Sequence, residues 1–183
     1  DAMRNKDVNR GLSPTAYSYG NIAGVTNIDT RVSQYALGTR TSVAFSNRSY
    51  TLRAQAFHAR DLGNDLYLAV SGVARWADEG IIEGSFYNSA GLFTALEKKF
   101  ADKHSLSLTL FVAPTQRGQQ AASLQEVYDL AGSIYYNSYW GYQDGQKRNS
   151  RVVKTIEPTA IVSYEWKIDP QQVLRAGLGY HYT

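Results

Sequence analysis

The chain has 183 residues and a formal net charge of +3, which comes from 19 basic and 16 acidic side chains spread along its length. This balance is too weak and too diffuse for a nucleic-acid-binding surface, so we expect no nucleic-acid partner. The absence of cysteine excludes disulfides and thiolate metal sites. Hydrophobic residues make up 43% of the chain, enough for a sizeable core, yet no stretch approaches the ~18 consecutive apolar residues of a membrane-spanning helix.

Residues 1–37 contain glycine-rich turns and precede the regular part of the pattern. The stretches Gly11-Leu-Ser-Pro-Thr15 and Tyr17-Ser-Tyr-Gly20 come before Gly20-Asn-Ile-Ala-Gly24, which leads into Val25-Thr-Asn-Ile-Asp-Thr-Arg31. These glycines lead into a predicted strand and not into a helix, so they lack the helix dipole that phosphate binding needs. Asp1 begins without a charged and apolar leader, and we expect the chain to be a piece of a longer protein.

From Thr41 onward, apolar and polar side chains alternate, which is the period of a strand with one apolar face. The segments at 41–45 and 87–100 show the alternation weakly. Five segments show it clearly, with these apolar rows: Leu52, Ala54 and Ala56; Leu66, Leu68, Val70, Gly72, Ala74 and Trp76; Leu106, Leu108, Leu110 and Val112; Ala160, Val162, Tyr164, Trp166 and Ile168; Leu174, Ala176, Leu178, Tyr180 and Tyr182. A helix would place alternate residues on opposite sides of its axis, so the pattern predicts an all-β meander of about seven strands.

The predicted connections alternate between short and long. Tight polar turns fall at 61–65, 101–104 and 169–171, whereas longer connections fall at 78–86 and at about 114–150. The link at 47–50 is short where a long one is expected. Such alternation is typical of an antiparallel transmembrane β-barrel that has tight turns on one rim and long loops on the other.

The longest connection has features of its own. Ser123-Leu-Gln-Glu126 has the form of a capping box and predicts one short helix that ends at Gly132. The next residues include a group of rings, which either line the mouth and stack on a ligand or pack the loop onto itself and into an aromatic girdle: Tyr135, Tyr136, Tyr139, Trp140 and Tyr142. The basic residues Lys147, Arg148 and Arg151 either bind lipopolysaccharide phosphates or form a solvated loop tip.

No motif for catalysis or for metal binding stands out. His58, His104 and His181 are far apart and lack ligand spacing, and Asp78, Glu79 and Glu83 lack the pattern of a calcium loop. The glycine motifs of nucleotide-binding and hydrolase sites are absent. We therefore expect no catalytic residue, no metal and no cofactor.

Several stretches resemble TonB-dependent receptors of the Gram-negative outer membrane. They are 11–15, 17–20 and 20–31 in the N-terminal part, and Glu97-Lys-Lys-Phe100, Asp102-Lys-His-Ser-Leu106, Tyr135-Tyr-Asn137 and Trp140-Gly-Tyr142 further on. The resemblance implies that residues 1–37 are the C-terminal end of a plug domain. It also implies that residues 38–183 are the N-terminal part of a β-barrel of about 22 strands, with an extracellular loop at about 114–150.

The resemblance further implies a receptor that binds a scarce nutrient at the cell surface and imports it into the periplasm. Expected partners are the TonB energy-transducing complex, membrane lipid and lipopolysaccharide, a small-molecule, peptide or glycan cargo, and a surface lipoprotein. Polar residues of the lumen-facing parity would contact the plug: Arg53, Gln55, Arg75, Glu165, Lys167 and Arg175. About seven strands cannot close in lipid by themselves, so we expect a partial barrel.

Two other classes of protein remain as alternatives. An outer-membrane barrel enzyme would place Asp/His or Ser/His groups on neighbouring strand tips of the loop rim, whereas we expect His58 and His104 at the ends with tight turns. A soluble β-sandwich binding module would cover one face of its strands with a second sheet. Exposure of the Leu106, Leu108 and Leu110 row separates the sandwich from the barrel.

Overall fold

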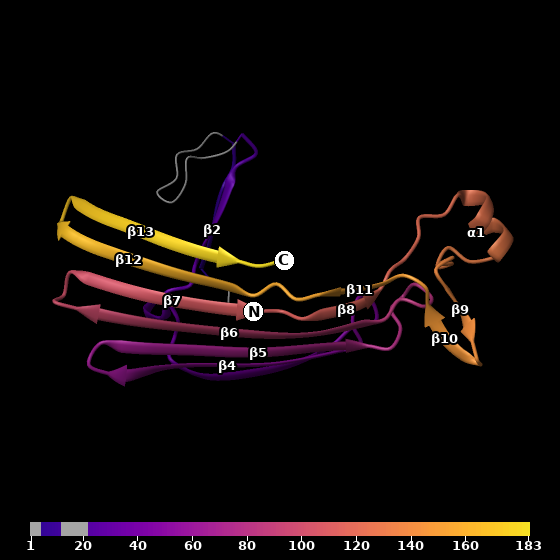
Figure 1. The fold of residues 1–183 in the computed structure, drawn as a ribbon, viewed down its shortest axis with the longest axis horizontal. Helices are drawn as coiled ribbons and strands as arrows, with labels where there is room; N and C mark the ends of the chain where they lie inside the picture. The colour runs from indigo at the N-terminus through magenta and orange to yellow at the C-terminus, as the bar shows by residue number, and fades with distance from the viewer. Residues whose placement is uncertain (1–4, 12–21) are drawn as a thin grey trace.

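The computed structural model describes residues 5–11 and 22–183. Its main element is an antiparallel sheet in which seven long strands lie in the order of the chain, apart from a long excursion before β12 (Figure 1). These strands are β3 (Gly38–Phe45), β4 (Leu52–Gly63), β5 (Leu66–Ala77), β6 (Tyr87–Phe100), β7 (His104–Val112), β12 (Thr159–Asp169) and β13 (Gln172–His181). The predicted all-β, antiparallel architecture is confirmed. The motifs at 12–20 lie outside the described residues.

The sheet is open within the part of the chain that the structure describes. Strand β3 pairs only with β4, and β13 pairs only with β12, so these two strands form its edges. No helix in 5–11 or 22–183 has the length and apolar content needed to cross a bilayer.

The two faces of the sheet differ in chemistry. Residues directly opposite each other share a face, and one such row runs through Leu68, Leu96, Leu108, Val162 and Leu178. We call the face with this row the open face. The neighbouring row on the other side contains Tyr67, Glu97, Ser107 and Ser163, and we call that side the packed face. The predicted alternation is therefore confirmed, except that a register shift between Lys167 and Asp169 interrupts the pairing at Ile168.

Short and long connections lie at opposite ends of the strands. Three tight links, at 64–65, 101–103 and 170–171, form what we call the turn rim, on the left of Figure 1. Asn64 and Asp65 have φ angles of 51° and 59°, the left-handed conformation that a two-residue hairpin turn needs and that Asn and Asp tolerate. The connections 46–51, 78–86 and 113–158 lie at the other end, the loop rim.

The excursion from 113 to 158 first extends the sheet and then leaves it. Strand β8 (Thr115–Gly118) pairs with β6 and with β11 (Val152–Thr155). Between them lie α1 (Gln125–Ala131) and a hairpin of β9 (Trp140–Gln143) and β10 (Gln146–Asn149).

The predicted helix is present, and Gly132 ends it in the left-handed conformation with φ 65°. The predicted capping box is wrong, because Leu124 occupies the N-cap position and no side chain caps the helix. The β9–β10 hairpin was not predicted, although its turn is an Asp-Gly pair, Asp144 and Gly145, with φ angles of 52° and 75°.

The N-terminal residues pack on the packed face. They form a two-stranded sheet of β1 (Asn5–Asn9) and β2 (Val25–Asp29), followed by the 3-10 turn η1 (Val32–Gln34). Val32 is fully buried, and the Tyr35 ring lies 5.3 Å from that of Phe57 and 6.4 Å from that of Phe93. Three buried alanines of the packed face complete this cluster and leave room for the larger side chains: Ala59, Ala69 and Ala95.

Candidate functional site

A buried carboxylate joins the N-terminal segment to the sheet. The side chain of Glu97 is only 1% exposed. Its Oε2 accepts a hydrogen bond from the Ser33 amide at 2.7 Å, and its Oε1 accepts from the hydroxyls of Ser33 at 3.0 Å and Ser105 at 3.1 Å. The Lys99 ammonium lies 4.0 Å from Oε1. A charge removed from water requires such partners, so Glu97 fixes the position of Ser33 on the packed face.

A second carboxylate nearer β13 accepts two guanidinium groups. Glu165 Oε2 is 3.2 Å from Arg31 Nη1 and 2.9 Å from Arg175 Nε. Arg31 also forms a fork with Asp29, at 3.0 Å from Nε to Oδ1 and 2.6 Å from Nη2 to Oδ2. Burial acts to raise the pKa of Asp29, but the hydrogen bonds from Arg31 outweigh it and hold that pKa below its ordinary value.

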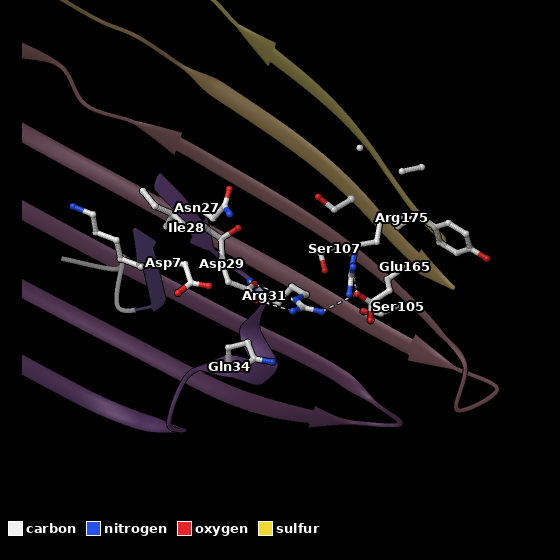
Figure 2. Close-up of a pocket in the computed structure, with 16 residues that line it drawn as sticks. Asp7, Asn27, Ile28, Asp29, Arg31, Gln34, Ser105, Ser107, Glu165 and Arg175 are labelled. Atoms are coloured by element: carbon white, nitrogen blue, oxygen red, sulfur yellow. Dashed lines mark hydrogen bonds and ion pairs between the residues drawn. The ribbon is translucent and has the colours of Figure 1, made fainter. Parts of the chain in front are cut away.

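A polar cavity of about 780 Å³ lies between the N-terminal segment and strands β7, β12 and β13. Figure 2 shows Asp7, Asn27 and Arg31 on one side and Ser107 and Arg175 on the other, with the Arg31–Glu165 contact between them. This volume falls in the range of about 300–1,000 Å³ typical of small-molecule sites. In the described ranges, no group of three or more His, Asp or Glu side chains is placed to hold a metal ion.

The residues predicted to contact a plug divide into two groups. Glu165 contacts Arg31 of the N-terminal segment directly, and Arg175 shares the same carboxylate. Arg53, Gln55 and Arg75 lie nearer the loop rim. Arg53 is directly opposite Arg75 and donates to Gln55 Oε1 at 3.2 Å.

Lys167 lies on the packed face at the turn rim, directly opposite Val173. The residues that sequence reasoning missed at this interface are Asp29, Arg31, Ser33 and Glu97. The available sequence signal for Glu97 was its spacing, because it lies on the same face of a strand as Ala95 and Phe93.

Two asparagines fasten the long excursion to the 78–86 connection. Asn137 is 1% exposed, and its Nδ2 donates to the carbonyls of Glu83 at 2.9 Å and Gln119 at 3.2 Å. Its Oδ1 accepts from the amides of Ala121 and Tyr139 at 3.0 Å and 3.2 Å. Asn149 Nδ2 likewise donates to the carbonyls of Gly84 at 2.9 Å and Gln119 at 2.8 Å. The connections therefore form one hydrogen-bonded unit, which no local pattern indicated.

The predicted aromatic group is partly used for packing. Trp140 lies against Gly84, where an added Cβ would be 2.2 Å from the Trp140 Cβ. The Lys147 ammonium lies 4.3 Å from the Trp140 ring centre and forms an ion pair with Glu79. Arg151 lies over the Tyr139 ring at 5.7 Å. Tyr136 is half-buried, whereas Tyr135 and Tyr142 are exposed.

A cluster of rings marks the open face at the turn rim. His104 stacks on Phe100 at 5.5 Å and on Trp166 at 5.6 Å, and its Nδ1 lies 2.6 Å from the Tyr164 hydroxyl. The predicted place of His104 at a tight turn is confirmed. The same prediction for His58 is wrong, because β4 continues to Gly63 and leaves His58 in mid-strand, 2.8 Å from the Thr39 hydroxyl.

Comparison of the chain with protein-family models, with curated proteins and with solved structures finds no match. The features that bear on function are therefore the contrast between the two faces of the sheet and the contacts of the N-terminal segment.

Proposed function

We propose that the chain is part of a TonB-dependent outer-membrane receptor that binds a scarce nutrient at the cell surface and imports it into the periplasm. In this proposal residues 1–37 are the end of the plug and residues 38–183 are the first part of a barrel of about 22 strands. The single observation that supports it most is the difference between the two faces of the sheet. The open face is apolar and uncovered, while the packed face holds the N-terminal segment.

The open face has the composition and exposure of a lipid-facing surface. Leu106, Leu108 and Leu110 are 43%, 37% and 43% exposed, so no second sheet or helix of the described chain covers them. A β-sandwich would bury this row against its other sheet, and an exposed apolar band of this width is unfavourable in water. The row from Leu68 to Leu178 continues the band across the neighbouring strands.

Strand length and the position of the aromatic rings also support a lipid-facing open face. A tilted strand needs about 9–11 residues to cross the hydrocarbon of a bilayer. Six of the seven long strands, β4 to β7, β12 and β13, have between 9 and 14 residues, and β3 has 8. Phe100, His104, Tyr164 and Trp166 gather at one end of the open face, where rings with a polar tip suit the boundary between lipid and water.

The packed face supports the assignment of a plug. A β-barrel lumen is polar and can be filled by a separate segment, and the contacts of Glu97 and Glu165 with Ser33 and Arg31 are of that kind. In the proposed barrel, further strands of the parent protein pair with the edges β3 and β13. Unpaired strand edges would otherwise cost several kcal/mol for each backbone group in lipid.

The proposal assigns the loop rim to the cell exterior. Exposed Tyr135 and Tyr142 are then available to a cargo, whereas Tyr139 and Trp140 stabilise the loops that present them. The proposed partners are those of such receptors: the TonB complex through the plug, membrane lipid and lipopolysaccharide around the open face, and a surface lipoprotein. We propose no catalytic step.

A charge placed on each face tests the proposal. Leu108→Arg in the parent protein should reduce assembly into the membrane, since a lipid-facing arginine near the bilayer midplane costs about 2–4 kcal/mol. The matched variant Ser42→Arg puts the same charge at an exposed position of the packed face and should be tolerated. Both are measured as heat-modifiable, detergent-extracted protein in the outer-membrane fraction. Equal assembly of the two variants, or full solubility of the parent protein without detergent, would contradict the proposal.

A further inference from the structure

A second cavity, of about 490 Å³, lies at the loop rim between the connections 46–51 and 78–86 and strand β8. Its polar lining includes Arg48, Ser85, Tyr87, Arg117 and Gln119. Arg117 is directly opposite Tyr87 on β6, so this part of the cavity wall belongs to the packed face. The size of the cavity is that of a site for a small molecule.

The two arginines of this cavity are not ion-paired with any described residue. Within 5–11 and 22–183, neither the Arg48 nor the Arg117 guanidinium has an ion-pair or hydrogen-bond partner, and both residues are exposed. Among the described lining residues there is no Asp or Glu. The connection 78–86, which forms one wall, carries Asp78, Glu79 and Glu83; none of the three lines the cavity, and Glu79 is bound to Lys147 and to the Gly84 amide.

Two further arginines lie on the packed face, in the row next to that of Arg117. One row below Arg117, Arg53 lies directly opposite Arg75, which lies opposite Ser89. Neither this row nor the row of Arg117 contains an acidic residue. At the turn rim, by contrast, Glu97 and Glu165 are both bound to the N-terminal segment. In these strand rows of the packed face, the arginines therefore lie near the loop rim and Glu97 and Glu165 lie at the opposite end.

We infer that Arg48 and Arg117 form a binding site for a small ligand with two or more negatively charged oxyanion groups, carboxylate or phosphate. The planar guanidinium presents a fork of donors that matches both groups, and a concave basic surface concentrates anions from solution. The inference rests on the proposed function and names the class of cargo that the receptor accepts.

Calorimetric titration of the detergent-solubilised parent protein tests the inference, with citrate, inorganic pyrophosphate and neutral maltose as probes. Citrate, pyrophosphate or both should bind, maltose should not, and added salt should weaken binding. Double substitution of Arg48→Gln and Arg117→Gln should raise Kd at least about tenfold, the ratio that corresponds to about 1.4 kcal/mol. The control Arg60→Gln removes one positive charge from the open face and should leave Kd within about twofold.

Several outcomes would overturn the inference. They are no binding of either anion by the folded parent protein, equal binding of maltose, or equal weakening by Arg60→Gln. Preference for citrate over pyrophosphate, or the reverse, identifies which oxyanion the site accepts. Failure here would leave the membrane assignment standing, because that assignment is tested by Leu108→Arg and by detergent dependence. Thermal unfolding of each variant shows that a loss of binding is not a loss of fold.

Discussion

The contact between Glu97 and Ser33 gives the sharpest test of how the N-terminal segment is held. Glu97→Ala removes three hydrogen-bond acceptor contacts, two to Ser33 and one to Ser105. It also leaves the Ser33 amide, between the N-terminal segment and the sheet, without its hydrogen-bond acceptor. A hydrogen bond to a charged group contributes about 1.5–3 kcal/mol, and removing one partner of a buried charged contact costs about 3–5 kcal/mol.

The substitution should therefore lower the free energy that holds the N-terminal segment on the sheet by about 3 kcal/mol. This value is at the low end of the range because alanine has no charge that must be removed from water. This corresponds to roughly 100-fold faster deuterium exchange of the Ser33 amide, since each 1.4 kcal/mol is about tenfold. Exchange is measured by mass spectrometry on peptides that cover 25–37, in the detergent-solubilised parent protein.

Two comparisons make the measurement specific. Glu97→Gln keeps one side-chain oxygen as an acceptor and should accelerate exchange less, by roughly tenfold. The amide of Val70 lies in the middle of β5 and should exchange equally slowly in all three proteins. If Glu97→Ala leaves the Ser33 amide within about threefold of its original rate, the carboxylate does not hold the segment and the interface has been misread.

Two further predictions concern the loops and the pH dependence. Gly84→Ala should destabilise the loop rim, because its φ of +70° disfavours a side chain and the new Cβ would collide with Trp140; faster proteolysis within 113–158 checks this, and unchanged proteolysis would count against the packing. The lowered pKa of Asp29 means that its contact with Arg31 stabilises the fold above its unfolded pKa of about 3.8, and that this contribution is lost as the pH falls through the lower folded value. Between pH 6 and pH 3 the parent protein should therefore lose more stability than its Asp29→Asn variant; parallel denaturation curves would contradict the assignment.

Local sequence patterns predicted most of the strands and turns. The alternation in 105–113, 159–168 and 174–182 depends only on residues two apart, and the tight turns depend on Asn and Asp at left-handed positions, so both could be predicted without knowing any partner. The weak segment at 87–100 became the longest strand, with 14 residues, because β5 and β7 pair with it on both sides. In β6, pairing with two neighbouring strands therefore compensates for a weak alternation of apolar and polar residues.

The candidate sites depended on contacts that no local pattern contains. Ser33 and Glu97 are 64 residues apart, and Arg31 and Glu165 are 134 apart, so the polarity of the packed face was predictable but its partners were not. The structural role of Asn137 was not predicted for the same reason, since its hydrogen bonds to the carbonyls of Glu83 and Gln119 join two separate connections. The role of Trp140 beneath Lys147 also required the fold.

Because Glu165 binds both Arg31 and Arg175, the N-terminal segment can leave the sheet at this point without unpairing the carboxylate. If the N-terminal segment withdraws, Arg31 departs with Asp29 as its companion, and Glu165 keeps Arg175. Each side therefore keeps an ion-pair partner. Buried ion pairs are hard to break because an unpaired buried charge is destabilising. Glu97 would keep Ser105 and the Lys99 ammonium but lose two hydrogen bonds to Ser33, whereas Glu165 would lose a single contact to Arg31, so the segment is held more firmly at Glu97.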